Sequence, residues 1–118
     1  MTNLFSVDVE DYFCAENMRA VIPFDRWDSM ELRVEKTVST LLDLFDAHRL
    51  RATFFVLGWI ALKAPRLIEE IERRGHEIAT HGFGHMPLRT MTEEAFERDL
   101  AKGGTHPQGS YAEALQIT

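Results

Sequence analysis

Cysteine, basic signal-like segments and long hydrophobic runs are all scarce in this chain of 118 residues. The single cysteine, Cys14, excludes an intrachain disulfide, which fits a reducing compartment. The longest apolar run, from Phe54 to Leu62, is far shorter than the roughly 20 residues that a membrane span needs. The first residues lack the basic stretch and apolar core of a secretory signal. We therefore expect a cytoplasmic protein with no membrane span.

An excess of basic residues is also missing. The chain has 13 Lys and Arg residues against 19 Asp and Glu residues, which gives a formal net charge of -6. Nucleic-acid binding favours a basic face, so we expect no nucleic-acid partner. The hydrophobic share of 45% and the charged share of 27% are typical of a folded globular chain. This length predicts a single domain.

Three short segments have the composition of buried strands. They are residues 3–9, 51–58 and 76–81, and the second of them is rich in aromatic and β-branched side chains. Polar or glycine residues bound each segment. The sequence between the first strand and residue 29 has no clean period, and we expect an irregular loop there, with at most one helical turn.

Helical periodicity follows the first two strands. Apolar residues recur at three- and four-residue steps from Val34 to Phe45, and Ser29 is the expected N-cap of this helix. The segment from Pro65 to Gly75 has a proline suited to a first helical turn and a glycine suited to a C-terminal cap. The chain therefore alternates strands with helices.

A third helix is expected after Thr92, its N-cap, with Phe96 and Leu100 facing inward. Strand–helix alternation predicts an α/β fold with a parallel sheet. Two adjacent glycines, Gly103 and Gly104, then interrupt the pattern. We expect the domain to cover residues 1–102, and an atypical tail, frameshifted or disordered, to cover residues 103–118.

Metal-binding residue types follow two of the predicted strands. Asp8, Glu10 and Asp11 end the first strand, and His81 and His85 come at the end of the third. Because the carboxyl ends of parallel strands lie at one edge of a sheet, these side chains are expected to meet there. Two imidazoles and a carboxylate are typical ligands of zinc and its transition-metal neighbours.

Each half of this set also has a structural interpretation. The H-x-x-x-H spacing often occurs by chance, and acids at a strand end are often solvated. A metal site is indicated because the carboxylates and the histidines are expected at the same edge of the sheet. Gly82 and Gly84 are then expected to let the backbone turn tightly, so that both rings face one point.

Other residues of chemical interest are predicted to be structural. His76 is expected to pack or cap, and His48 suits a helix C-terminus. Cys14 has no neighbouring histidine or second cysteine, so we expect a buried thiol. Three aromatic residues could line a sugar site but are more typical of a core: Trp27, Trp59 and Phe83.

Three motifs, in order, resemble the polysaccharide deacetylase family, also called the NodB-homology domain or carbohydrate esterase family 4. They are "FSVDVEDYF", "RATFFVLGWIA" and "GHEIATHGFGH". The opening motif is similar to the subgroup associated with bacterial exopolysaccharide and exosortase systems. The resemblance covers residues 3–100. It implies the N-terminal part of a deformed (β/α) barrel and metal-dependent removal of N- or O-acetyl groups from a sugar polymer or oligosaccharide.

The resemblance also implies roles for individual residues. The histidine motif falls on His81 and His85 as metal ligands, and the first aspartate falls on Asp8 as the general base. The expected cation is zinc, with cobalt and nickel as alternatives. Many family members have an aspartate ligand where this chain has Val9, so the third ligand is either Glu10 or Asp11. Alternation along the strand favours Glu10, because it puts Glu10 on the same side as Asp8.

The resemblance ends before the family's later motifs. Its members continue to an R-x-P arginine that orients the base and to a distal histidine that acts as general acid. Here no arginine follows Arg98, and His106 has a different context. We therefore expect a truncated form with weak or no activity. The alternatives are a non-catalytic metal- or sugar-binding remnant and a metal-independent hydrolase of amides or cyclic ureides.

Overall fold

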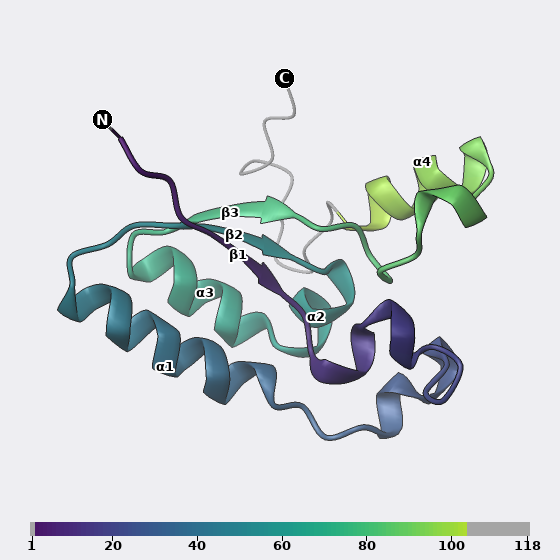
Figure 1. The fold of residues 1–118 in the computed structure, drawn as a ribbon, viewed down its shortest axis with the longest axis horizontal. Coiled ribbons are helices and arrows are strands. Elements are labelled where there is room, and N and C mark those ends of the chain that lie inside the picture. The colour runs from purple at the N-terminus through teal and green to yellow at the C-terminus, as the bar shows by residue number, and fades with distance from the viewer. Residues whose placement is uncertain (1, 104–118) are drawn as a thin grey trace.

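The computed structural model describes residues 2–103, and its centre is one parallel sheet of three strands in the order β1-β2-β3. The strands are β1 (Ser6–Val9), β2 (Thr53–Val56) and β3 (Glu77–Thr80). All three run in the same direction, so that their carboxyl ends lie at one edge of the sheet (Figure 1). The predicted α/β architecture with a parallel sheet is confirmed.

Helices lie between the strands and after the last one. The α-helices are α1 (Val34–Ala47), α2 (Gly58–Lys63), α3 (Pro65–Arg73) and α4 (Glu93–Gly103). The 3-10 helices are η1 (Tyr12–Cys14), η2 (Glu16–Met18), η3 (Phe24–Ser29) and η4 (Leu88–Thr90). Helices α1 and α3 pack together on one face of the sheet, whereas α4 lies beyond the end of β3 (Figure 1). Among residues 2–103, no helix has the length and apolar character needed to cross a membrane.

The core lies between the sheet and these helices. Val9, Phe54, Val56 and Ile78 are buried on this side, and the ring of Phe54 contacts that of Phe45 in α1 at 6.1 Å between centroids. Burying a side chain of this size contributes about 2 kcal/mol to folding. Because successive strand residues face opposite sides, the residues between them point to the other face of the sheet.

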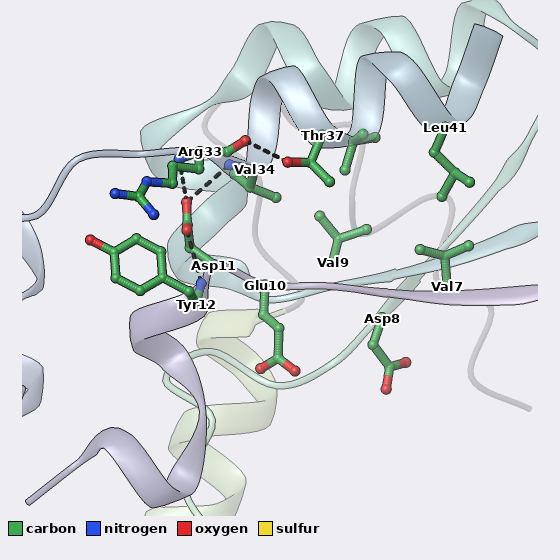
Figure 2. Close-up of a pocket in the computed structure, with 11 residues that line it drawn as sticks. Val7, Asp8, Val9, Glu10, Asp11, Tyr12, Arg33, Val34, Thr37 and Leu41 are labelled. Atoms are coloured by element: carbon green, nitrogen blue, oxygen red, sulfur yellow. Dashed lines mark hydrogen bonds between the residues drawn. The ribbon is translucent and has the colours of Figure 1, made fainter. Parts of the chain in front are cut away.

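The N-terminus of α1 differs from the prediction. Ser29 was expected to cap this helix, but it ends η3, and α1 begins only at Val34. The helix receives its cap from Asp11, whose Oδ2 accepts hydrogen bonds from the backbone N–H groups of Arg33 at 2.7 Å and Val34 at 3.0 Å (Figure 2). The first N–H groups of a helix lack partners within it, and the positive end of the helix dipole favours a carboxylate.

Helix α3 has both of its predicted ends. Pro65 is its first residue, and Gly75 follows its last turn with a φ of 86°, a left-handed conformation that glycine adopts without strain. Its apolar stripe, formed by Leu67, Ile68 and Ile71, is buried. These predictions are confirmed.

Helix α2 was not predicted. It lies within the continuous apolar run after β2, where strand was expected as far as Gly58, and its residues from Gly58 to Ala61 are all buried. Leu62 and Lys63, its last two residues, are exposed, so this helix of six residues is too short for its exposed side to produce a visible period.

Helix α4 begins as predicted but packs differently. Thr92 Oγ1 accepts a hydrogen bond from the Ala95 N–H at 3.1 Å, which confirms the cap. The inward orientation of Phe96 is wrong, because this side chain is 39% exposed, and Leu100 is only half-buried. Gly103 is the buried residue of α4, and Asp99 and Lys102 of this helix also contact the turn after β3 at Phe83. Residues 104–118, including His106 and most of the predicted tail, lie outside the described residues.

The residues predicted to be structural lie in the core or at a helix end. His48 is the C-cap of α1, and the buried His76 accepts a hydrogen bond at Nδ1 from the Ala52 N–H at 3.1 Å. Burial raises the pKa of the Cys14 thiol to about 12. The three aromatic residues weighed as a sugar site are buried in the core: Trp27, Trp59 and Phe83.

Candidate metal centre

The predicted site residues come from the ends of the two outer strands. Asp8 lies in β1 and Glu10 directly after it, whereas His81 directly follows β3 and His85 lies four residues further along. The carboxylates of Asp8 and Glu10 point to the same side of β1, as alternation predicts, whereas Val9 points toward α1 (Figure 2). The cavity of about 350 Å³ between β1 and α1 lies on the Val9 side, so the acids point away from it.

Three of these side chains converge. Glu10, His81 and His85 each offer one ligand atom, and the three atoms lie within 4.8 Å of one another. Glu10 Oε2 is 3.2 Å from His85 Nε2, and the two imidazole rings meet edge to face with centroids 5.1 Å apart. Asp8 Oδ2 lies 3.9 Å from His81 Nε2, and its side chain is 62% exposed.

Two of the converging atoms have no hydrogen-bond partner in the described chain. Glu10 Oε2 and His81 Nε2 are buried, and neither makes a hydrogen bond to any residue between 2 and 103. Burying a polar atom without a partner costs free energy, so such an atom usually has a partner, which can be a water, an ion or a ligand. A carboxylate oxygen and two imidazole nitrogens form a donor set that fits a divalent cation. The group therefore could hold a metal ion.

A backbone carbonyl orients the His85 ring. Nδ1 of His85 lies 2.8 Å from the carbonyl oxygen of Cys14, which can only accept a hydrogen bond. A proton on Nδ1 donates to this oxygen, and in the neutral ring it leaves a lone pair on Nε2, which lies 3.2 Å from Glu10 Oε2. Metal-binding histidines are commonly oriented by such a bond from the second ring nitrogen.

The backbone that carries both histidines turns sharply. Gly82 has a φ of 73°, as its predicted role requires. Gly84 was expected to provide a second turn, but the second residue with positive φ in residues 81–86 is His85, at 56°. Gly84 instead provides space, because a Cβ there would lie 3.3 Å from the ring of Phe24.

Two helices hold this turn in place. The N–H groups at the start of α2 donate to it, from Gly58 to the Gly82 carbonyl at 2.8 Å and from Trp59 to the Phe83 carbonyl at 3.1 Å. On the other side, the carboxylate of Asp99 in α4 accepts the Phe83 N–H at 3.1 Å. Sequence reasoning gave Asp99 no role, because nothing in its spacing distinguishes it from the other acids of α4.

Asp11 lies outside the converging group. Its Oδ2 caps α1, its Oδ1 accepts the Tyr12 N–H at 2.8 Å, and the residue is only 4% exposed. Both oxygens thus have backbone partners. Of the two acids left open as a third ligand, the geometry brings Glu10 to the histidines.

A groove adjoins the two imidazoles. It encloses about 460 Å³ between the turn after β3 and helix α4. Besides His81 and His85, its wall is largely apolar, with contributions from Met86, Leu88, Met91, Phe96 and Leu100. The centre therefore opens onto a surface that can admit a molecule larger than water.

Comparison with known proteins identifies the family. The sequence profile of the family described as "Polysaccharide deacetylase" matches residues 15–105, which is most of the chain. The chain belongs to the polysaccharide deacetylase family. The match includes both histidines and Asp99, whereas Asp8 and Glu10 precede it.

Individual relatives agree with this assignment. The chain is 32% identical over 88 residues to a chitooligosaccharide deacetylase of Rhizobium leguminosarum bv. trifolii, covering 67% of this chain and 41% of that protein. It is 37% identical over 60 residues to a peptidoglycan-N-acetylmuramic acid deacetylase of Bacillus subtilis, covering 51% of this chain and 23% of that protein.

A solved structure supports the fold. A crystal structure from Mycobacterium smegmatis, assigned to the polysaccharide deacetylases, matches with a TM-score of 0.67 and 30% identity, covering 96% of this chain and 37% of that one. The deacetylase fold class is confirmed, and the described residues correspond to the N-terminal part of the barrel. The chain spans less than half the length of these relatives. The exosortase-associated subgroup is not tested by them and stays a prediction.

Proposed function

We propose that this chain carries the metal-binding part of a metal-dependent polysaccharide deacetylase. Glu10, His81 and His85 are the proposed ligands, and Asp8 is the proposed general base. The observation that supports this most strongly is the convergence of three ligand atoms within 4.8 Å, two of which are buried without a hydrogen-bond partner. Membership of a deacetylase family supplies the reaction type.

The bound cation would act as a Lewis acid that polarises an acetyl carbonyl and makes water more acidic. The ligand set of two histidines and a carboxylate favours zinc, with cobalt and nickel as alternatives. The carbonyl of Cys14 would keep His85 oriented with its free lone pair toward the cation. Asp8 is exposed and has no hydrogen bond in the described chain, so its carboxylate is available to accept a proton from water.

The proposed substrate is an acetylated sugar polymer or oligosaccharide. The two relatives above are named for acetylated chitooligosaccharides and peptidoglycan, which share N-acetylated amino sugars. The D-V-E-D-Y-F motif resembles the subgroup associated with exopolysaccharide systems, which adds an exopolysaccharide to the candidate polymers. The apolar groove beside the histidines would provide a surface against which a sugar ring can lie.

We further propose that these 118 residues by themselves release little acetate. No arginine follows Arg98 and the only later histidine is His106, so the arginine and acid implied by the family resemblance are not among these residues. The main alternative function is that of a non-catalytic remnant that binds a metal ion.

Metal analysis and an acetate assay test these proposals. Purified chain should bind about one Zn²⁺ ion, and His81→Ala should abolish this binding, whereas the exposed His48→Ala should not. Wild-type chain without metal affinity would contradict the proposed centre. Acetate release from N-acetylated chitooligosaccharide separates an enzyme from a remnant. Release that persists after chelation would favour the metal-independent hydrolase.

A further inference from the structure

The chain between β1 and α1 packs against the turn that carries the histidines. We call residues 12–29 the linking segment and residues 81–86 the histidine loop. The ring of Phe24 in the linking segment lies 6.4 Å from that of Phe83 and close against Gly84. A segment without regular periodicity thus covers one side of the proposed metal centre.

One guanidinium of the linking segment binds the histidine loop at three atoms. Arg19 Nη2 donates to the carbonyl oxygens of Gly84 and His85, both at 3.0 Å, and Nη1 lies 2.9 Å from Met86 Sδ. The planar, forked guanidinium has several donors in fixed directions, which the ammonium of a lysine does not. Arg19 therefore restrains two consecutive peptide groups around His85.

His85 needs such a restraint. Its φ of 56° lies in the left-handed region, where a residue with a Cβ is disfavoured unless its surroundings hold it. The linking segment holds both parts of the residue, because Arg19 binds its carbonyl and the Cys14 carbonyl accepts from its Nδ1. Nε2 is thereby directed toward Glu10, 3.2 Å away.

We propose that Arg19 is a positioning residue for His85, one that fixes the backbone and ring of this ligand in its metal-binding orientation. The inference rests on the proposed function, in which His85 binds the cation. Arg19 does not itself touch the ligand atoms. Residues that orient metal ligands commonly change metal affinity tenfold to a hundredfold when they are removed.

The linking segment offers a matched control. Arg26 belongs to the same segment and is exposed, and no contact of its side chain with the histidine loop is found among the described residues. The test compares wild type, Arg19→Met, Arg19→Lys and Arg26→Met in the full chain. Methionine keeps the aliphatic stem but removes the donors, whereas lysine keeps the charge without the fork.

Two measurements report on the centre itself. Zn²⁺ affinity is measured by competition with a chelator, and the visible absorption of bound Co²⁺ reports on ligand geometry. We expect Arg19→Met to weaken Zn²⁺ binding at least tenfold and to change the Co²⁺ spectrum, with Arg19→Lys in between. Arg26→Met should remain within twofold of wild type. Thermal unfolding of the metal-free variants checks that they are folded.

A third measurement needs no metal. Correlation of ring ¹⁵N and ¹H shifts in the metal-free protein identifies the tautomer of His85, which should be the Nδ1–H form in wild type and a mixture in the Arg19 variants. If wild type binds no metal but the Arg19 variants change this tautomer, the positioning role stands and the proposed function fails. A folded Arg19→Met with wild-type affinity, spectrum and tautomer overturns the inference. If Arg19→Met does not fold, the same wild-type results from Arg19→Lys overturn it.

Discussion

At the scale of single residues, His76 illustrates a histidine used for packing. It packs against the rings of Phe45 and Phe54, with centroids 5.8 and 5.1 Å away, and its Nδ1 accepts the Ala52 N–H. Accepting at Nδ1 requires the neutral ring. Burial lowers the pKa of His76, and this outweighs the opposite effect of Asp46. Protonation therefore opposes folding at this position.

We predict that His76 makes the protein less stable in mild acid. Because its folded pKa is lower than its unfolded value of about 6.5, the unfolded chain binds the extra proton first as pH falls. The free energy of unfolding should then decrease below pH 6.5, by at most about 1.4 kcal/mol per pH unit for this one group. Urea denaturation at pH 7.5 and pH 5.5 measures the change.

The control for this prediction is His76→Asn, which keeps an acceptor near the Ala52 N–H but does not titrate. It should be less stable than wild type at pH 7.5, because the ring contacts are lost. Its loss of stability between the two pH values should be smaller. An equal loss in both proteins would assign the pH dependence to groups other than His76.

Glu10 and Asp11 are neighbours with different predicted effects. Asp11→Asn should reduce stability by about 1 kcal/mol, since the amide has one acceptor oxygen for the three N–H groups that the two carboxylate oxygens accept, and should leave Zn²⁺ binding intact. Glu10→Gln should lose Zn²⁺ affinity with little loss of stability. Denaturation and Zn²⁺ titration of both variants check this. Loss of metal by Asp11→Asn at full stability would make Asp11 the third ligand.

At the scale of elements, glycines allow α2, α4 and the histidine loop to meet. A Cβ at Gly58 would lie 2.8 Å from both Gly103 Cα and Phe83 Cδ2. A Cβ at Gly103 would lie 2.8 Å from the carbonyl carbon of Gly82. Only hydrogen side chains permit this approach, so the C-terminal end of α4 packs against the backbone of the turn, in addition to the side-chain contacts of Asp99 and Lys102 with Phe83.

The variant Gly58→Ala tests this junction, because the sign of its change in the free energy of unfolding depends on how tightly the junction is packed. Replacing glycine by alanine in a helix ordinarily stabilises it by roughly 0.5–1 kcal/mol. Here the added methyl group overlaps backbone and ring atoms, so we expect a net destabilisation of about 1–3 kcal/mol. Chemical denaturation measures it, and Leu62→Ala at a half-exposed position of the same helix serves as control. A stabilised Gly58→Ala would show that the junction is loose.

The elements also show what the sequence could predict. The three strands, α3 and the Thr92 cap were predicted because their signals are local: a short apolar run, a proline, a glycine, a hydroxyl at a helix start. The cap of α1 was missed because it comes from Asp11, more than twenty residues earlier in the chain. The exposure of Phe96 was missed because apolar residues at helical spacing predict an apolar stripe, but they do not show which other element packs against that stripe.

The same distinction between local and distant signals applies to the site residues. Strand alternation predicted that Asp8 and Glu10 share a side, and parallel order predicted that the histidines lie at the same edge. The contacts that orient His85 were not predictable, because they use the backbone carbonyl of Cys14 and the side chain of Arg19. Neither residue has a sequence signal of its own.

At the scale of the whole molecule, the proposed ligands connect the two outer strands. Glu10 follows β1 and the histidines follow β3, with β2 between them. Within residues 2–103 these outer strands have no further strand beside them, and α1 and α3 cover only one face of the sheet. A cation at this point would link the first and last strands across the edge of the sheet, adding to the stability of the folded chain.

Metal binding should therefore raise the thermal stability of the entire described unit. At a free Zn²⁺ concentration a hundred times Kd, linkage adds about 2.7 kcal/mol to the free energy of unfolding, which raises Tm by roughly 10 °C or more for a domain of this size. His81→Ala should show no such shift, because it removes one of three ligands and leaves the core unchanged. Scanning calorimetry with Zn²⁺ and with chelator measures both proteins. An equal shift in His81→Ala would place the stabilising cation elsewhere, and no shift in wild type would mean that Glu10 and the histidines converge without binding one.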